Sequence, residues 1–560
     1  MSFDNARSNL IRNPKSVTGN RRDVAFRDLP RQSALFLKYL DQDADALCFY
    51  PCSPTLDNLE RFSKEIAARS FPRREMAAIL RRQNESFGAD DAVFQQIDML
   101  EKPDSVAIIT GQQTGIFIGP LYTIYKTLTA IKLAEELRRR GINAIPVFWM
   151  ESEDHDLAEA THCTVLDSET SARSFNFSGL FDESETATRS VGSLRFSENI
   201  REAAKEYLGY LPDSEWKSEV QSLIESAYAP GASFAEAFAR AMRRIFQGTG
   251  LALFNPNDAD AKRLAAPVFL RAVSEAERIY DALVQRDEEL RALKFHTQTR
   301  VLENATLLFL VLDGKRRALE RNGANFRLKN SEREFTGEEL AQYAEKTPAL
   351  FSPNVLLRPI VQDHLFPTAA YVGGAAEIAY FAQAETLYRL FSRSMPAIWP
   401  RNGFTLIEPE IAANMKRLNI GFEDCFTARQ ALLEKVLAGY SRSVENLDNL
   451  YDLLDRRMLE IQPDAQAVEE RLGGATDLAR RKILSNVRYL KSRVVRLEAE
   501  AQKSVAEAAD AILNHCRPRG NLQERELTIF HFLSRYGAAA LDKIRSAIDP
   551  ENFHHRLLNL

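Results

Sequence analysis

The 560-residue chain lacks the features that mark membrane, secreted and nucleic-acid-binding proteins. No run of about 18 apolar residues occurs, so we expect no transmembrane helix and no membrane partner. The first residues (MSFDNARSNLIRNPKS) are polar and have no apolar centre, so we expect no secretory signal and a cytoplasmic location. The net charge is -5 and the isoelectric point about 6.1, which gives no basic excess for binding nucleic acid.

Cysteine and the common catalytic motifs are also scarce. The five cysteines are scattered, which predicts no disulfide framework in a reducing compartment: Cys48, Cys52, Cys163, Cys425 and Cys516. The pair Cys48 and Cys52 has no second half, so we expect no zinc site. The sequence contains no H-E-x-x-H motif, no paired CxxC and no nucleophile elbow.

The residues that are present indicate an α/β core. The composition, 45% hydrophobic and 27% charged, is that of a globular protein, and the length suggests about three domains. The apolar runs Ser105–Thr110 and Ala144–Met150 predict buried parallel strands, and Leu121–Arg140 has helical spacing between them. Further strand candidates, separated by helical patterns, complete a doubly wound parallel sheet at 251–254, 307–312 and 397–407.

One polar segment, Thr110–Lys126 (TGQQTGIFIGPLYTIYK), lies where the first strand should meet the helix. Its glycines permit close backbone approach, and the free N–H groups of a helix N-terminus favour an anion such as phosphate. The spacing matches no dinucleotide or P-loop motif, so tight strand-to-helix packing is the alternative. The polar content favours a ligand at the C-terminal edge of the sheet. The predicted binding residues here are Thr110, Gly111, Gln112, Gln113, Gly115, Gly119 and Tyr122.

A second segment, Glu151–Asp156 (ESEDHD), follows the second strand directly. Four acids and one histidine at a strand end can bind Mg²⁺, anchor an ammonium group or hold a base near neutrality. A solvated acidic loop is the alternative. We expect Asp154, His155 and Asp156 to be catalytic and Glu153 to bind substrate.

The third segment is 357–380, in which Arg358 precedes a Gly373-Gly374 pair that leads into an apolar helix. Arg358 could clamp a carboxylate or phosphate through two parallel hydrogen bonds. Glu377 could cap the helix or contact an amine. The predicted binding residues in this segment are Arg358, Gln362, Tyr371, Gly373, Gly374 and Glu377.

The C-terminal part has a different pattern. Apolar residues alternate by four and three from Leu433 to Ile461, which predicts a coiled-coil seam of about four heptads. We expect Pro463 and the Gly473-Gly474 pair to break it. A second seam begins at Ile483 and slips by four after Ala501, as in a stutter. Two such helices predict an antiparallel hairpin, either a structural arm or a surface for homodimerisation.

Three stretches together resemble the bacillithiol biosynthesis cysteine-adding enzymes, the BshC family. They are the segment at 110–126, PVFWMESEDHD at 146–156 and LRPIVQDHLFPTAAYVGGAAEIAYFAQ at 357–383. The resemblance covers most of the chain, including the coiled coil and PRGNLQER at 518–525. It implies a Rossmann-like fold with connecting-peptide insertions, a coiled coil that mediates dimerisation, and the joining of cysteine to the amine of glucosaminyl malate.

Amide formation from a free carboxylate needs activation, most simply by ATP with Mg²⁺. The layout also resembles class I aminoacyl-tRNA synthetases, whose H-I-G-H signature corresponds here to Phe117-Ile118-Gly119-Pro120. Both histidines that would stabilise developing charge are missing. Lys126, His155 and Arg358 are the candidate substitutes.

The patterns and the resemblance divide the chain into three parts. Residues 1–415 form the Rossmann-like core, with a loose arm over 1–30, a helical segment from about Ala34 and insertions at about 163–250 and 313–350. Residues 416–516 form the antiparallel coiled coil, and 517–560 return to the core. Cysteine and glucosaminyl malate are the expected substrates. The alternatives are a synthetase-like protein that binds nucleotide or RNA and a non-catalytic coiled-coil scaffold.

Overall fold

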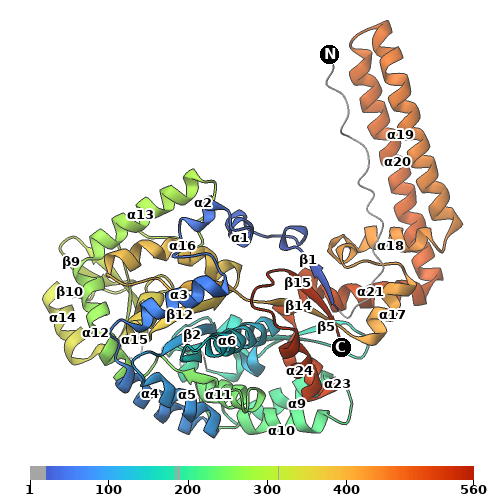
Figure 1. Cartoon of the computed structure of the whole chain (residues 1–560). Helices are drawn as coiled ribbons and strands as arrows, with labels where there is room; N and C mark the ends of the chain where they lie inside the picture. The colour runs from blue at the N-terminus through green and yellow to red at the C-terminus, as the bar shows by residue number, and fades with distance from the viewer. Residues whose placement is uncertain (1–20, 183–185, 187–188, 313–314) are drawn as a thin grey trace.

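The computed structural model describes residues 21–182, 186, 189–312 and 315–560 (Figure 1). Most of the arm predicted over 1–30 lies outside these residues. The rest is not loose, because β1 (Arg21–Val24) pairs antiparallel with β15 (His555–Asn559) and Phe26 is buried behind it. No helix in the described part of the chain is long and apolar enough to cross a bilayer.

A five-stranded parallel sheet forms the centre of the larger domain. Its strand order is β13 (Ala397–Pro400), β12 (Thr368–Gly373), β2 (Val106–Gln113), β3 (Ala144–Glu151) and β6 (Ala252–Phe254). All neighbouring strands are parallel. The apolar runs predicted to be buried strands are β2 and β3, and all their residues up to Gly111 and Met150 are buried.

Helices cover both faces of this sheet, which confirms the predicted doubly wound architecture. Ile109 and Val147 pack in one core cluster with Ile378 of α16 (Ala375–Leu390). Phe148, the next residue along β3, packs instead with Ile124 of α6 (Leu121–Arg139). Alternate strand residues therefore face opposite helical layers, because successive side chains of a strand point to opposite sides.

Other helices complete the two layers and the insertions. Those before β2 are α1 (Ala34–Leu40), α2 (Ala44–Leu47), α3 (Leu56–Ala67), α4 (Arg73–Ser86) and α5 (Asp91–Leu100). Between β3 and β6 lie α7 (Leu157–Ala160), β4 (His162–Leu166), β5 (Ala172–Asn176), α9 (Ile200–Tyr210), α10 (Lys217–Ala227) and α11 (Phe234–Ile245). After β6 come α12 (Ala259–Ser274), α13 (Ala276–Ala292), α14 (Gly337–Lys346) and α15 (Arg358–Leu365).

Two strand candidates do not join the parallel sheet as predicted. The run 307–312 belongs to β7 (Ala305–Leu312), in an antiparallel sheet of order β10-β9-β8-β7-β11. Its other strands are β8 (Lys315–Asn322), β9 (Asn325–Leu328), β10 (Glu334–Phe335) and β11 (Phe351–Pro353). Only two residues separate β7 from β8, too few for the crossover that parallel pairing needs. The sheet thus extends beyond the predicted insertion 313–350.

The run 397–407 is likewise not one strand. The parallel sheet ends at Pro400, and β14 (Gly403–Ile407) pairs with β15 near the end of the chain. The three-stranded sheet β1-β15-β14 therefore joins both ends of the described chain to the central domain. Arg401 and Asn402 form the corner between the two sheets.

The C-terminal part contains a helical hairpin that projects away from the sheet domain (Figure 1). Its helices are α19 (Arg442–Val468) and α20 (Leu472–Ala501), preceded by α17 (Pro409–Arg417) and α18 (Arg429–Ala438). The chain bends at Gln502, where the seam slips, and continues as α21 (Lys503–Cys516). It returns to the core as α22 (Gln523–Glu526), α23 (Ile529–Tyr536), α24 (Ala538–Ala547) and β15.

The expected helix breakers are not where the hairpin turns. Pro463 lies inside α19, and Gly473 and Gly474 lie inside the first turn of α20. The turn comprises residues 469–471. Pro463 removes one backbone hydrogen bond near the end of an exposed helix, which packing along the hairpin seam tolerates. At a helix start the backbone N–H groups need no partner within the helix, so the glycines cost little there.

Candidate active site

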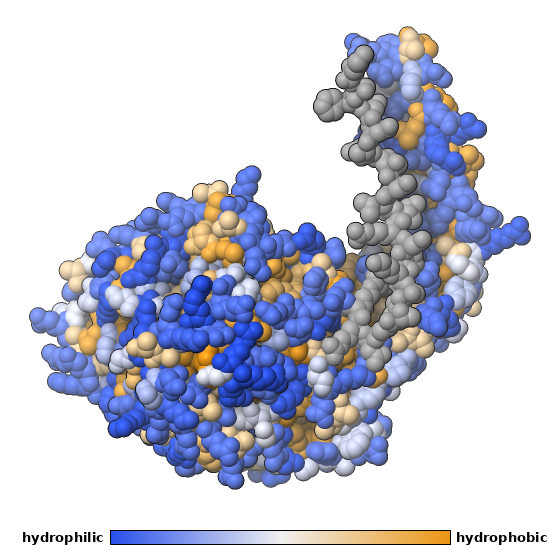
Figure 2. Space-filling model, in the orientation of Figure 1, coloured by the Kyte–Doolittle hydropathy of each residue, from blue (hydrophilic) through white to orange (hydrophobic). Residues whose placement is uncertain are grey.

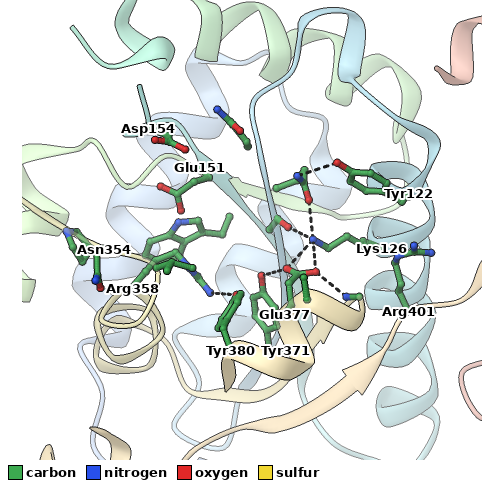
Figure 3. Close-up of a pocket in the computed structure, with 18 of the residues that line it drawn as sticks. Tyr122, Lys126, Glu151, Asp154, Asn354, Arg358, Tyr371, Glu377, Tyr380 and Arg401 are labelled. Carbon is green, nitrogen blue, oxygen red and sulfur yellow. Dashed lines mark hydrogen bonds and ion pairs between the residues drawn. The ribbon is translucent and has the colours of Figure 1, made fainter. Parts of the chain in front are cut away.

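A cavity of about 520 Å³ opens at the C-terminal edge of the parallel sheet (Figure 3). Strands β2, β3 and β12 end at it, which is where open α/β sheets bind ligands. Helices α6, α15, α16 and α22 and the antiparallel insertion supply much of the remaining wall. Its polar and aromatic lining residues are Gln112, Gln113, Tyr122, Lys126, Trp149, Glu151, Asp154, Phe309, Arg316, Asn354, Arg358, Tyr371, Glu377, Tyr380, Arg401 and Arg525.

Lys126 and Glu377 form a closed network on one side of the cavity (Figure 3). The Lys126 ammonium lies 2.8 Å from the Glu377 carboxylate, 3.0 Å from Gln112 Oε1, and also donates to the carbonyl of Gly111. Glu377 further accepts from Tyr371 OH and from Gly374 N–H, each at 2.7 Å. Glu377 therefore caps the N-terminus of α16 and also forms an ion pair with Lys126. Burial lowers the pKa of Lys126, although Glu377 acts in the opposite direction.

Arg358 is held rigidly but has no acidic partner among the described residues. Its guanidinium donates to Gln362 Oε1 at 2.9 Å and to Tyr380 OH at 3.1 Å. It also lies over the rings of Trp149 and Tyr371, at 5.6 and 5.2 Å from their centroids. These contacts fix its orientation without a direct ion pair, although the charge of Glu151 acts on it from nearby. A guanidinium held in this way can bind an anionic ligand.

The C-terminal segment contributes a second basic region. Arg401 forms two hydrogen bonds with buried Glu524, at 2.6 and 3.0 Å, and lies near the ring of Tyr122. The next residue, Arg525, also lines the cavity. In the described part of the chain, Arg525 has no hydrogen bond or ion pair through its side chain. The segment that follows the coiled coil therefore completes the cavity.

The acidic loop divides into residues that reach the cavity and residues that do not. Glu151 and Asp154 line it. Glu153 is buried in an ion pair with Lys262 at 2.7 Å, and Asp156 caps α7 by accepting from Glu159 N–H. His155 lies outside the lining, and both its ring nitrogens lack hydrogen-bond partners among the described residues. Burial lowers the pKa of His155, with Arg316 acting in the same direction.

Other predicted binding residues have structural contacts instead. Thr110 donates to the carbonyl of Val372, and Gln362 holds Arg358 from behind. Gly119 has a φ of 68°. A Cβ added to Gly115 would lie 3.1 Å from the Cα of Gly119. These glycines form the corner between β2 and α6, as the packing alternative predicted. The predicted residues outside the cavity lining are Thr110, Gly115, Gly119, Glu153, His155, Asp156, Gln362 and Gly373.

Several lining residues were not predicted. Arg316 and Asn354 carried no motif that distinguished them from ordinary residues, whereas Trp149 and Tyr380 lie inside the quoted stretches but were not singled out as binding residues. Arg401 directly follows the end of a strand, and Arg525 lies in the PRGNLQER stretch. Their positions in the sequence could have suggested both as binding residues. Glu151 was the first acid of the ESEDHD loop, but the sequence does not show which acid faces the cavity.

Few carboxylates in the cavity are placed to hold a divalent cation. No group of three or more His, Cys, Asp or Glu side chains that could hold a metal comes together within the described residues. Mg²⁺ commonly uses one or two carboxylates and completes its coordination with phosphate oxygens and water. Asp154 in the cavity therefore fits Mg²⁺ delivered with a nucleotide.

Comparison with known proteins identifies the family. The model described as "Bacillithiol biosynthesis BshC, N-terminal Rossmann-like domain" matches residues 23–402. The model for the C-terminal coiled-coil domain of the same family matches residues 404–560. The chain belongs to the BshC family.

Relatives in the BshC family align over nearly the whole chain. One from Koribacter versatilis is 35% identical, covering 96% of this chain and 99% of the relative. One from Salinibacter ruber is 34% identical, covering 94% and 96%. Both are named "Putative cysteine ligase BshC". A solved structure named as a putative arginyl-tRNA synthetase from Campylobacter jejuni covers 84% of this chain and all of its own, at 10% identity; its TM-score of 0.23 supports no conclusion.

Proposed function

We propose that this chain is a ligase that joins the carboxyl group of L-cysteine to the amine of glucosaminyl malate, completing bacillithiol. Membership of the BshC family is the main support. The cavity adds a chemical argument, because its charged side chains without an ion-pair partner include both cations and an anion. Among the described residues, no carboxylate lies within bonding distance of Arg316, Arg358 or Arg525. No described cationic group lies within bonding distance of the Glu151 carboxylate.

These groups match the charges of the proposed substrates. Glucosaminyl malate carries two carboxylates and one amine, and cysteine carries a further carboxylate. Arg401 lies near Tyr122, on the side of the cavity opposite Glu151 and Asp154 (Figure 3). Arg525 also lines the cavity, and its charge acts on Tyr122. The malate carboxylates would bind this basic side, because guanidinium groups bind carboxylates in well-defined bidentate geometry. The sugar amine would then point towards the acidic side.

Activation of the cysteine carboxylate is assigned to ATP with Mg²⁺. ATP would convert the carboxylate oxygen into a leaving group that can depart when the amine attacks. Arg316 would hold phosphate oxygens, and Asp154 would supply an oxygen ligand to Mg²⁺. The proposal places the reaction in the cytoplasm, and all five cysteines are free thiols, which suits a reducing compartment.

The direct experiment supplies purified protein with ATP, Mg²⁺, cysteine and glucosaminyl malate. Bacillithiol should accumulate, as measured by mass spectrometry of the labelled thiol, and its formation should require all four additions. Absence of product together with absence of cysteine-dependent ATP consumption would overturn the proposal.

Substitution of Arg525 tests the basic side. Arg525→Gln removes an unpaired charge, so the KM for glucosaminyl malate should rise roughly tenfold or more while the KM for cysteine changes little. Arg519→Gln is the matched control, because Arg519 lies in the same segment, outside the cavity lining. Equal kinetics for both variants would remove Arg525 from the binding site.

A further inference from the structure

Glu151 differs from every other acid near the cavity in what surrounds its carboxylate. Glu377 accepts from Lys126, Tyr371 and Gly374. Asp154 accepts from the N–H of His155 at 2.7 Å. Within the described residues, the Glu151 carboxylate has neither a hydrogen bond nor an ion pair. Both of its oxygens are therefore available to a ligand in the cavity.

The position of Glu151 is fixed by the sheet. It is the last residue of β3 and pairs in register with Gln113, the last residue of β2. Figure 3 shows its side chain next to Asp154, across the cavity from Lys126 and Glu377. A group on a regular strand is held more firmly than one on a loop, which suits a reacting group.

The charged groups around Glu151 come from three elements. Arg358 of α15 and Arg316 of β8 favour the charged form of Glu151. Glu153 and Asp154, in the loop that follows β3, oppose it. Burial is the largest influence and raises the pKa of Glu151 to about 7. A carboxylate that lines the cavity without a hydrogen bond or ion pair of its own can accept a proton from a bound ligand.

We propose that Glu151 is the general base that takes the proton from the sugar ammonium group before amide formation. The inference rests on the proposed function, since it concerns the amine of glucosaminyl malate. An amine that still carries its third proton has no lone pair and cannot attack a carbonyl carbon. A positioned base is therefore required at the acidic side of the cavity.

The step balances as follows in atoms and charge. One N–H bond of the ammonium breaks and an O–H bond to Glu151 forms, which converts a cation and an anion into a neutral amine and a neutral acid. The amine lone pair then forms the C–N bond to the cysteine carbonyl carbon. The C–O bond to the group derived from ATP breaks, and that group leaves with the electron pair. The nitrogen, positively charged after the attack, loses a second proton to the departing oxyanion, which leaves the neutral amide.

Competing assignments within the acidic loop are weaker on geometry. Asp156 uses its carboxylate to cap α7, and Glu153 is neutralised by Lys262. His155 lies outside the cavity lining. None of the three presents a free basic atom to the cavity.

The kinetic test compares two nucleophiles in Glu151→Gln. Glucosaminyl malate needs deprotonation, whereas hydroxylamine is already unprotonated at neutral pH. Turnover with glucosaminyl malate should fall by about 100- to 10,000-fold, while ATP-dependent formation of cysteine hydroxamate should stay within a few-fold of wild type. Glu159→Gln, an exposed neighbour outside the lining, is the matched control. Equal losses with both nucleophiles, or no loss with either, would overturn the assignment.

A binding test is independent of turnover. Wild type should bind glucosaminyl malate roughly tenfold or more tightly than glucosyl malate, which has a hydroxyl in place of the amine. Glu151→Gln should abolish this preference, and Glu159→Gln should retain it, as measured by calorimetry. A preference that persists in Glu151→Gln removes Glu151 from the amine site. The absence of product from wild type would instead refute the proposed ligase activity, so the two failures are distinguishable.

Discussion

Two imidazole rings are sealed between the sheet domain and the base of the hairpin. His515 Nε2 lies 2.7 Å from the carbonyl oxygen of Leu406, and His555 Nε2 lies 2.8 Å from Thr405 Oγ1. Both side chains are fully buried. Burial lowers the pKa of each ring from 6.5 to about 4. Each ring is therefore neutral in the native state at neutral pH.

This burial predicts a loss of stability in mild acid. Because folding lowers both pKa values, the native state has its full stability above pH 6.5 and loses it as the pH falls towards 4. Between pH 7 and pH 5 the free energy of unfolding should fall by about 2 kcal/mol for each ring. Urea unfolding followed by circular dichroism at the two pH values measures the difference.

A substitution separates this effect from general acid sensitivity. His555→Gln keeps a hydrogen-bonding group for Thr405 but cannot gain a proton, so the fall between the two pH values should shrink by about 2 kcal/mol. His554→Gln is the control, because His554 is the adjacent residue and is exposed. An unchanged pH dependence in His555→Gln would show that another group controls acid stability.

At the scale of single residues, the sequence located the site but did not sort its members. It placed Asp154, Lys126, Arg358 and Glu377 in polar segments at strand ends, and all four line the cavity. Glu151 was missed, because four acids within six residues look equivalent until their partners are known. The Lys262–Glu153 pair joins residues more than one hundred positions apart, which no local pattern reveals.

At the scale of elements, the corner between β2 and α6 is the most constrained turn near the site. Phe117, Ile118 and Gly119 all have positive φ, at 50°, 71° and 68°. Gly119 combines its φ with a ψ of -157°, a region essentially restricted to glycine. The corner buries Phe117 against Tyr207, with ring centroids 4.3 Å apart. The glycine is thus required by the backbone.

Gly119→Ala should lower the free energy of unfolding by about 1–3 kcal/mol, because alanine cannot adopt this conformation without strain. Urea unfolding provides the measurement. Gly209→Ala is the matched control: Gly209 lies in α9 with a helical backbone and open space around its Cα, so alanine should stabilise by up to about 1 kcal/mol. Equal effects of the two substitutions would contradict the argument.

Elements with strong local patterns were predictable, and those defined by distant pairing were not. The helix predicted over 121–140 is α6, which ends one residue earlier. An apolar run shows that a strand is buried, but not which sheet it joins. Residues 307–312 were therefore predicted to join the parallel sheet. They pair instead with β8, the next strand along the chain, in the antiparallel sheet of the insertion. The role of β15 depends on pairing with β1 and β14 at opposite ends of the chain.

At the scale of the whole molecule, the hairpin has more apolar residues than its own packing uses. The seam between α19 and α20 includes Val444, Leu484 and Val495, all buried. Leu450, Leu453, Leu490 and Leu497 lie off that seam and are 41–59% exposed. Figure 2 shows hydrophobic residues among charged ones along the hairpin. Exposed apolar side chains that repeat along one element can form an interaction surface.

We expect a second copy of the chain to cover these residues, so that light scattering gives the mass of two chains. Leu490→Lys combined with Leu497→Lys should yield one chain, because two charges would be buried in the interface. Leu302→Lys, with 44% exposure on the sheet domain, should leave the dimer intact. A wild-type mass of one chain would refute the dimer. Since neither Leu490 nor Leu497 lines the cavity, the monomeric variant should keep a kcat within a few-fold of wild type.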